Sequence, residues 1–316
     1  MAALKLVFCG TPRFAVPTLE ALIAAGHRIA LVVSQPDKPV GREQQRTAPP
    51  VKQTALAVGL AVTQPDKIRS NAEFRAQLES IAPDAIVVVA YGRIIPPWML
   101  VLPRLGCINL HASLLPKYRG AAPVQWAVAC GETTTGNTTM LLEEGLDTGP
   151  ILLQQQVPIT PELTAADLFD VLARAGAPLV VETLAGLEAG SIRPKAQDHS
   201  LATLAPLLDR EDGQMDFVAR TATELKNRWR GFQPWPGAFT ALAGRKLIVH
   251  RLGVAEPLAD QTAAPGEVRI RNGHLFVACA QGTWLELLEL QLEGKKRMAA
   301  SEFLRGVQLA SGAQLG

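Results

Sequence analysis

Two polar residues interrupt the apolar segment INLHAS at residues 108–113. Asn109 and His111 lie two positions apart, so both point to the same face of the strand that this segment predicts. Each would cost about 1–3 kcal/mol if buried without a partner. A lone buried histidine is more often structural, but an amide donor beside an imidazole can stabilise an oxyanion and handle a proton. The pair therefore favours a functional site.

Three further segments could take part in chemistry. In EEGLDTGPI, Asp147 stands between two glycines, and the sequence alone favours a turn in which it accepts a local hydrogen bond. The segment SLLP, residues 113–116, is either an ordinary loop or an apolar wall whose backbone groups could bind a flat heterocycle. The cations of KYRGAAP are equally compatible with an anion contact and with plain surface.

The polar segment QPDKPVGREQQRTAPPVK, residues 35–52, predicts a long loop. Long loops in compact domains tend to be functional or disordered, and Arg42 and Arg46 could either meet phosphate or remain solvated. The segment CGTPRFAV follows the first apolar run, where a dinucleotide fingerprint would stand. Because it has one glycine instead of GxGxxG, we do not expect NAD binding.

The first part of the chain alternates between strand and helix patterns. This βα alternation predicts an α/β fold with a Rossmann-like, doubly wound, mostly parallel sheet, in which ligands bind beyond the carboxyl ends of the strands. The strands are expected at residues 4–10, 29–35, 84–92, 107–113 and 138–144, and the helices at 17–26, 71–81, 124–132 and 164–190.

The pattern changes after residue 190. Residues 191–207 show little periodicity and predict a linker between a domain at 1–190 and one at 208–316. The last part opens with a helix candidate at residues 221–232, and Asn272-Gly273 between alternating runs predicts a hairpin. Short strands of this kind predict a smaller, OB-like β-barrel.

Composition sets bounds on the function. The 316 residues are enough for two domains, and 48% hydrophobic with 19% charged residues describes a soluble globular protein. No segment is long and apolar enough for a membrane span, so we expect a cytoplasmic protein. The four scattered cysteines and five histidines lack metal-ligand spacing, which predicts no metal site. Lysine and arginine exceed the acidic residues over residues 220–316, a weak indication of nucleic-acid binding.

Several segments together resemble one family. The pattern NxHxSLLPxYRG with a downstream DTG resembles that of the wider 10-formyltetrahydrofolate transferases, so it indicates only the superfamily. The opening FCGTPRFAVPTLEAL, the QPDKP loop, YRGAAP and RGFQPWPGAFT narrow the resemblance to the methionyl-tRNA formyltransferase family. The resemblance implies transfer of a formyl group from 10-formyltetrahydrofolate to the α-amino group of methionine on initiator methionyl-tRNA. It also implies a catalytic Rossmann-like domain and a C-terminal barrel that binds tRNA.

The family's functional residues correspond to positions of this sequence. The catalytic residues correspond to Asn109, His111 and Asp147, the folate-binding segment to Ser113, Leu114, Leu115 and Pro116, and the tRNA-binding arginine to Arg42. The resemblance implies no metal, no NAD, no membrane and no obligate protein partner, and we expect a monomer. This sequence departs from the family pattern at two places. Glu43, Gln44 and Gln45 replace cations of the loop. Asn137 and Thr139 replace apolar residues, and this second change should alter strand packing.

Two alternatives remain open from the sequence. A formyltransferase that acts on a sugar nucleotide or a purine precursor would share the same polar residues, although the long C-terminal part with RGFQPWPGAFT argues against it. A nucleic-acid-binding or NAD-dependent protein would use the Rossmann-like half as a scaffold.

Overall fold

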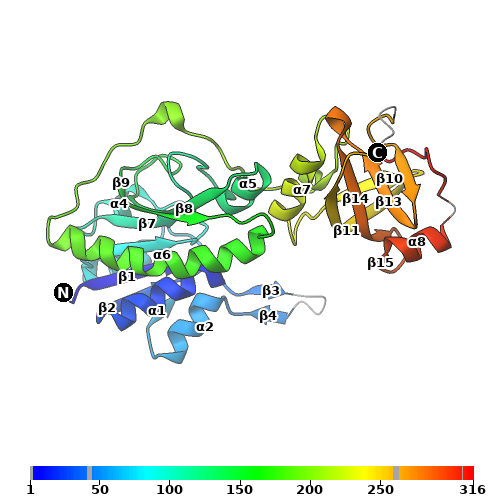
Figure 1. Cartoon of the computed structure of the whole chain (residues 1–316). Coiled ribbons are helices and arrows are strands. Elements are labelled where there is room, and N and C mark those ends of the chain that lie inside the picture. Colours follow the sequence, from blue (N-terminus) through cyan, green and yellow to red (C-terminus); the bar gives the residue numbers. More distant parts are fainter. Residues whose placement is uncertain (1–2, 41–44, 259–262, 308) are drawn as a thin grey trace. The chain divides into compact units, whose positions relative to one another are not determined.

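Seven strands form one sheet in the first part of the chain (Figure 1). The five strands from β5 to β7 are mutually parallel, while β8 and β9 continue the sheet in antiparallel pairing. The direction of winding reverses between β1 and β6, which is where sheets of this class bind ligands. In spatial order the strands are β5 (Val62–Thr63), β2 (Arg28–Val33), β1 (Lys5–Gly10), β6 (Ala85–Val89), β7 (Cys107–His111), β8 (Thr134–Leu141) and β9 (Ile151–Pro158).

Helices cover both faces of this sheet. Alternate residues of β1 point to opposite faces, so Leu6 and Phe8 join one apolar cluster and Val7 and Cys9 join another. The first cluster includes residues of α1 (Val16–Ala24), α2 (Pro50–Ala57) and α6 (Ala165–Glu188). The second includes residues of α3 (Ala72–Ile81) and α4 (Pro97–Leu100). The predicted doubly wound sheet is therefore confirmed.

The computed structural model describes residues 3–40, 45–258, 263–307 and 309–316. It divides into one unit of residues 1–123, 134–158 and 168–206 and another of residues 124–133, 159–167 and 207–316. The segment expected to be a linker is thus grouped, up to residue 206, with the sheet. Among the described residues, no helix is long and apolar enough to cross a membrane.

A helix cap predicted from the sequence marks the start of α3. Asn71 was expected to start a helix, and its Oδ1 accepts a hydrogen bond from the Phe74 N–H at 2.9 Å at the start of α3.

Two segments differ from the expectation. The strand expected at residues 138–144 is β8, which occupies residues 134–141 and runs antiparallel to β7. The loop expected at residues 35–52 is partly regular, because β3 (Lys38–Val40) pairs with β4 (Gln45–Thr47) before α2 begins.

The two departures on β8 pack this strand against α6. Asn137 is buried and its Nδ2 donates to the Leu172 carbonyl at 2.9 Å, while the Thr139 and Thr183 hydroxyls are 2.8 Å apart. Both partners belong to α6. These hydrogen bonds join β8 to α6, and the expected effect of the two residues on strand packing stays a prediction.

A carboxylate at the start of β6 ties this strand to β1 and should make stability depend on pH. Asp84 accepts from the Lys5 backbone N–H at 2.7 Å and from Arg104 Nε at 2.8 Å. The Lys5 hydrogen bond, followed by the Arg104 interaction, lowers the pKa of Asp84 from its usual 3.8. A carboxylate with a lowered pKa stabilises the fold above its unfolded pKa, and this contribution is lost as the pH falls through the folded value.

We therefore expect Asp84→Asn to lower the free energy of unfolding at pH 7, with a difference from wild type that shrinks below about pH 3.8. Urea unfolding over a pH series measures the difference. Asp170→Asn is the control, because its ion pair with Arg13 at 3.6 Å is largely exposed and should contribute little. A constant difference for Asp84→Asn at every pH would contradict the assignment.

The second unit contains a curled antiparallel sheet. Its order is β10-β11-β14-β13-β12, and β15 pairs with β14. The expected hairpin joins β12 to β13, with Asn272 and Gly273 both at positive φ. The elements are β10 (Phe239–Leu242), β11 (Arg245–Ala255), β12 (Val268–Arg271), β13 (His274–Ala278), β14 (Trp284–Leu292) and β15 (Met298–Ala299), with α5 (Pro123–Ala129), α7 (Ala222–Gly231) and α8 (Ala300–Gly306).

The last described residues bond to both edges of the curled sheet. Leu315 bridges to Leu242 on β10, and Gln314 bridges to Glu267 beside β12. Backbone hydrogen bonds from this segment satisfy edge groups that would otherwise face solvent. This arrangement agrees with the barrel-like unit expected from the sequence.

Candidate functional site

The strand β7 presents the polar pair on one face, as the spacing predicts. Asn109 and His111 lie two and four residues after Cys107 on β7, so their side chains point to the same face of the sheet as that of Cys107. Cys107 belongs to the apolar cluster on the α3 and α4 face. His111 is buried, whereas Asn109 is half-buried. Among the described residues, the Asn109 side chain has no hydrogen-bond partner. Its amide is therefore available to a group from outside the chain.

The two ring nitrogens of His111 face different partners. Nε2 lies 2.9 Å from the Tyr118 carbonyl oxygen, which can only accept, so Nε2 carries a hydrogen and donates it. Nδ1 lies 3.6 Å from Asp147 Oδ2. Any proton that His111 exchanges must therefore be held at Nδ1, on the side of the carboxylate.

Asp147 comes from the loop between β8 and β9, 36 residues after His111 in the chain. The sequence favoured a local turn acceptor for this residue. Its Oδ2 instead accepts from the Gly120 backbone N–H at 2.8 Å, across 27 residues of sequence. Its φ of +52° is in the left-handed region, which aspartate tolerates better than most residues. The structure thus places Asp147 beside His111, on the strand that also carries Asn109.

The segment Ser113–Pro116 follows directly and is fixed by β8 and β9. The Thr138 hydroxyl donates to the Ser113 carbonyl at 2.6 Å and accepts from the Leu115 N–H at 3.1 Å. Gln154 Nε2 donates to the Leu115 carbonyl at 2.9 Å. The backbone of Leu115 is therefore engaged within the protein, so the expectation of free main-chain groups does not hold at this residue. The half-buried side chain of Leu114 keeps an apolar face.

Of the cations in KYRGAAP, one is buried and bonds to polar side chains of the protein. Arg119 is 7% exposed, and its Nε and Nη2 donate to Gln197 Oε1 at 3.2 and 2.6 Å. Its Nη2 is also 3.0 Å from His199 Nδ1. The interpretation of Arg119 as plain surface was therefore wrong, whereas the anion contact stays a prediction. Lys117, by contrast, is exposed.

The segment 203–205 lies beside residues 118–120, which contact both His111 and Asp147. The Arg119 N–H donates to the Thr203 carbonyl at 2.8 Å, and the Ala205 N–H donates to the Arg119 carbonyl at 2.7 Å. Gly120 has φ +124°, and a Cβ there would lie 2.6 Å from the Ala205 carbonyl oxygen. Only glycine allows this close approach.

The tRNA-binding prediction at Arg42 lies outside the described residues, as do Glu43 and Gln44, while Gln45 opens β4. Among the described residues, no group of three or more His, Cys, Asp or Glu side chains is placed to hold a metal ion.

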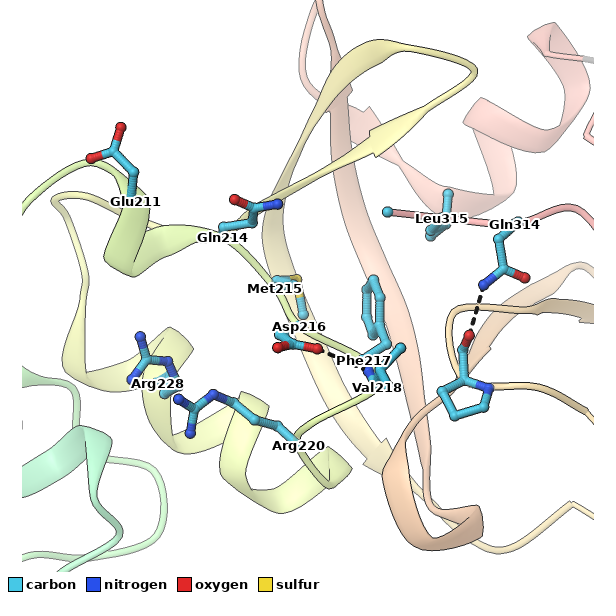
Figure 2. Close-up of a pocket in the computed structure, with 12 residues that line it drawn as sticks. Glu211, Gln214, Met215, Asp216, Phe217, Val218, Arg220, Arg228, Gln314 and Leu315 are labelled. Atoms are coloured by element: carbon cyan, nitrogen blue, oxygen red, sulfur yellow. Dashed lines mark hydrogen bonds between the residues drawn. The ribbon is translucent and has the colours of Figure 1, made fainter.

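A cavity of about 450 Å³ lies in the second unit (Figure 2). Its lining includes Glu211, Asp216, Arg220 and Arg228, but none of the residues predicted to form the site. The Asp216 carboxylate accepts hydrogen bonds from the Val218 and Ala219 N–H groups, and Arg228 donates to the Asp212 carbonyl at 2.9 Å. Asp216 and Arg228 are thus engaged in local structure, and we assign no chemistry to this cavity.

Family comparisons cover nearly the whole chain. Residues 4–184 match the formyl transferase family, and residues 207–308 match the formyl transferase C-terminal domain. The chain is 66% identical over 313 residues to a methionyl-tRNA formyltransferase of Acidobacterium capsulatum, covering 99% of this chain and 100% of that protein. It is 58% identical to a methionyl-tRNA formyltransferase of Koribacter versatilis, covering 98% of both.

Solved structures support the same fold at lower identity. An N-formyltransferase from Helicobacter canadensis, in complex with folinic acid and dTDP-3-aminofucose, matches with a TM-score of 0.64 at 18% identity, covering 90% of this chain and 98% of that one. HypX from Aquifex aeolicus in complex with tetrahydrofolic acid gives a TM-score of 0.61 at 16% identity, covering 96% of this chain and 47% of that one. Together with the family matches and the two close relatives, this fold confirms the resemblance, and the chain belongs to the methionyl-tRNA formyltransferase family of the formyl transferases.

Proposed function

We propose that this protein transfers the formyl group of 10-formyltetrahydrofolate to the α-amino group of methionine on initiator methionyl-tRNA, giving N-formylmethionyl-tRNA. The observation that carries the proposal is the half-buried Asn109 amide, which has no partner in the part of the chain that the structure describes. It lies on the same face of β7 as His111, whose Nδ1 is 3.6 Å from Asp147. The names of the two close relatives supply the substrate class. We further expect a monomer that acts in the cytoplasm.

The reaction requires stabilisation of negative charge on the formyl oxygen. The Asn109 amide has no partner among the described residues, so it can donate a hydrogen bond to this oxygen without breaking one within the protein. A protonated His111 Nδ1 is a second donor. His111 Nε2 is already bound to the Tyr118 carbonyl, which fixes the orientation of the ring.

The reaction also requires removal of a proton from the amine. A free α-amino group has a reference pKa of about 7.7–8.0, so part of the substrate is already the neutral nucleophile at pH 7 and no strong base is needed. After attack the nitrogen carries a positive charge. Loss of its proton lets the tetrahedral intermediate collapse with cleavage of the bond between the formyl carbon and N10, and N10 takes up a proton to give tetrahydrofolate. The Asp147 carboxylate, held by the Gly120 N–H and facing His111 Nδ1, would accept the amine proton directly or through water and stabilise a protonated imidazole.

The segment Ser113–Pro116 suits the folate donor as a rigid wall. Folate supplies the formyl group on a flat heterocycle, and such rings bind apolar walls with a few oriented polar groups. Thr138 and Gln154 hold the backbone of this wall, which leaves the Leu114 side chain as its apolar surface. We assign Ser113, Leu114, Leu115 and Pro116 to folate binding on this basis and on the family pattern.

A direct assay tests the function. The protein is incubated with 10-formyltetrahydrofolate and, in parallel reactions, methionyl initiator tRNA, an amino-sugar nucleotide or a purine precursor that bears an amine. We expect formylation of methionyl-tRNA alone. Formylation of the sugar nucleotide would favour the activity class suggested by the Helicobacter canadensis enzyme's ligand. Binding of NAD without folate would contradict the proposal.

The sequence predicts tRNA binding by the C-terminal domain, residues 208–316, and by Arg42 of the other domain. If Arg42 contacts a tRNA phosphate, Arg42→Ala should raise the KM for methionyl-tRNA while the KM for 10-formyltetrahydrofolate stays within about twofold. A lost phosphate contact also lowers the dependence of log affinity on log salt by about one. Tryptophan fluorescence titrations of tRNA at several salt concentrations measure this slope. Arg75→Ala is the control, because Arg75 pairs with Glu79 on α3 in an exposed ion pair. An unchanged slope in Arg42→Ala would remove Arg42 from RNA binding.

A further inference from the structure

We propose that Gln197 is a positioning residue for Asp147, and that the segment predicted to be a linker is therefore part of the catalytic unit. This inference rests on the proposed function, because it concerns the carboxylate assigned there to proton handling. Gln197 is 7% exposed and lies 50 residues after Asp147 in the chain.

The side-chain amide of Gln197 uses all of its hydrogen-bonding capacity within the protein. Its Nε2 donates to the Asp147 carbonyl at 2.8 Å and to the Gly149 carbonyl at 2.7 Å. Its Oε1 accepts twice from Arg119, from Nε at 3.2 Å and from Nη2 at 2.6 Å. Because arginine only donates, Oε1 must face Arg119, and the amide nitrogen must face the two carbonyls. One side chain thus holds the backbone on both sides of Thr148.

Asp147 needs such support. Its φ of +52° is a conformation that costs a non-glycine residue on the order of 1 kcal/mol or more, so surrounding contacts must hold it. Gly120 N–H fixes the carboxylate, and Gln197 fixes the carbonyl of the same residue. With both ends held, the direction of the Asp147 side chain toward His111 Nδ1 is determined.

Arg119 connects this support to the rest of the site. Within the described part of the chain, no carboxylate lies within 4 Å of the buried Arg119 guanidinium, so its main partner is the neutral oxygen of Gln197. The two residues adjacent to Arg119 contact the other side chains of the site. The Tyr118 carbonyl accepts from His111, and the Gly120 N–H donates to Asp147. A buried arginine that loses its acceptor is costly, which ties the position of Gln197 to that of the whole 118–120 segment.

The test compares Gln197→Ala and Gln197→Glu with wild type. Gln197→Glu keeps the shape and an oxygen for Arg119, but it replaces the two N–H donors by an oxygen that repels the Asp147 and Gly149 carbonyls. Displacement of a catalytic group by about 1 Å can cost about 10²-fold in rate. We therefore expect kcat for formylation to fall 10- to 100-fold in both variants, with the KM of each substrate within about threefold. Gln156→Glu is the matched control, because Gln156 is an exposed glutamine on β9.

A double-mutant cycle separates positioning from general destabilisation. If Gln197 acts through Asp147, Gln197→Ala combined with Asp147→Asn should be no slower than Asp147→Asn alone. Losses that multiply would overturn the inference. So would wild-type kcat in Gln197→Glu, since that variant keeps the Arg119 contact and loses only the carbonyl contacts.

Amide hydrogen exchange provides a measurement that needs no substrate. Peptides that cover residues 143–151 should exchange faster in Gln197→Ala than in wild type, while those from β1 and β6 should not change. Unchanged exchange at 143–151 would overturn the inference. An inactive wild type would overturn the proposed function, whereas an active wild type with equally active Gln197 variants would overturn this inference alone.

Discussion

Asn109→Ala should lower kcat for formylation about 10²- to 10³-fold without lowering thermal stability. The loss is that expected for removing one donor to a developing oxyanion. Stability should be unchanged because the Asn109 amide is half-buried and bonds to nothing among the described residues. Steady-state formylation with both substrates varied, together with a thermal unfolding scan, measures the two quantities.

Asn71→Ala is the opposite case and serves as the control. The Asn71 side chain caps α3 through the Phe74 N–H, so its removal should cost about 1 kcal/mol of stability while kcat stays at the wild-type value. Should Asn109→Ala instead destabilise the fold and keep its kcat, Asn109 would be a structural residue and the oxyanion would need another donor.

Asp147→Asn should lower kcat about 10²- to 10⁴-fold, the range typical of losing a positioned acid or base. Asparagine has nearly the same shape, tolerates the positive φ, and can still accept the Gly120 hydrogen bond through its oxygen. The backbone contacts from Gln197 are also untouched, since they involve carbonyls and not the side chain. The variant therefore removes little except the negative charge beside His111.

The measurement for Asp147→Asn is kcat over a range of pH, with 10-formyltetrahydrofolate binding followed separately. We expect folate binding within about threefold of wild type, because the hydrogen bonds that hold Ser113–Pro116 in the described part of the chain are made by residues other than Asp147. Asp170→Asn, at a largely exposed ion pair, should match wild type in both assays. A variant with more than a tenth of wild-type kcat would exclude Asp147 from proton transfer.

The parts of the fold that depend on neighbouring residues could be predicted from the sequence. Hydrophobic period, the Asn71 cap and the Asn272-Gly273 turn act over a few residues, so they fixed α3, the β12–β13 hairpin and the buried strands. The direction of β8 and the β3–β4 pair were not predictable in this way. Strand direction depends on which chain segments meet, and the apolar pattern of β8 is compatible with either direction.

The same distinction between local sequence pattern and long-range contact applies to the candidate site. The sequence by itself determined that Asn109 and His111 share a face, because side chains alternate along any strand. Only the tertiary structure decided that Asp147 faces His111, that Arg119 is buried, and that Gln197 holds the Asp147 loop. These contacts join residues 36, 78 and 50 positions apart, and hydrogen bonds over such separations depend on the path of the whole chain, which no local pattern encodes.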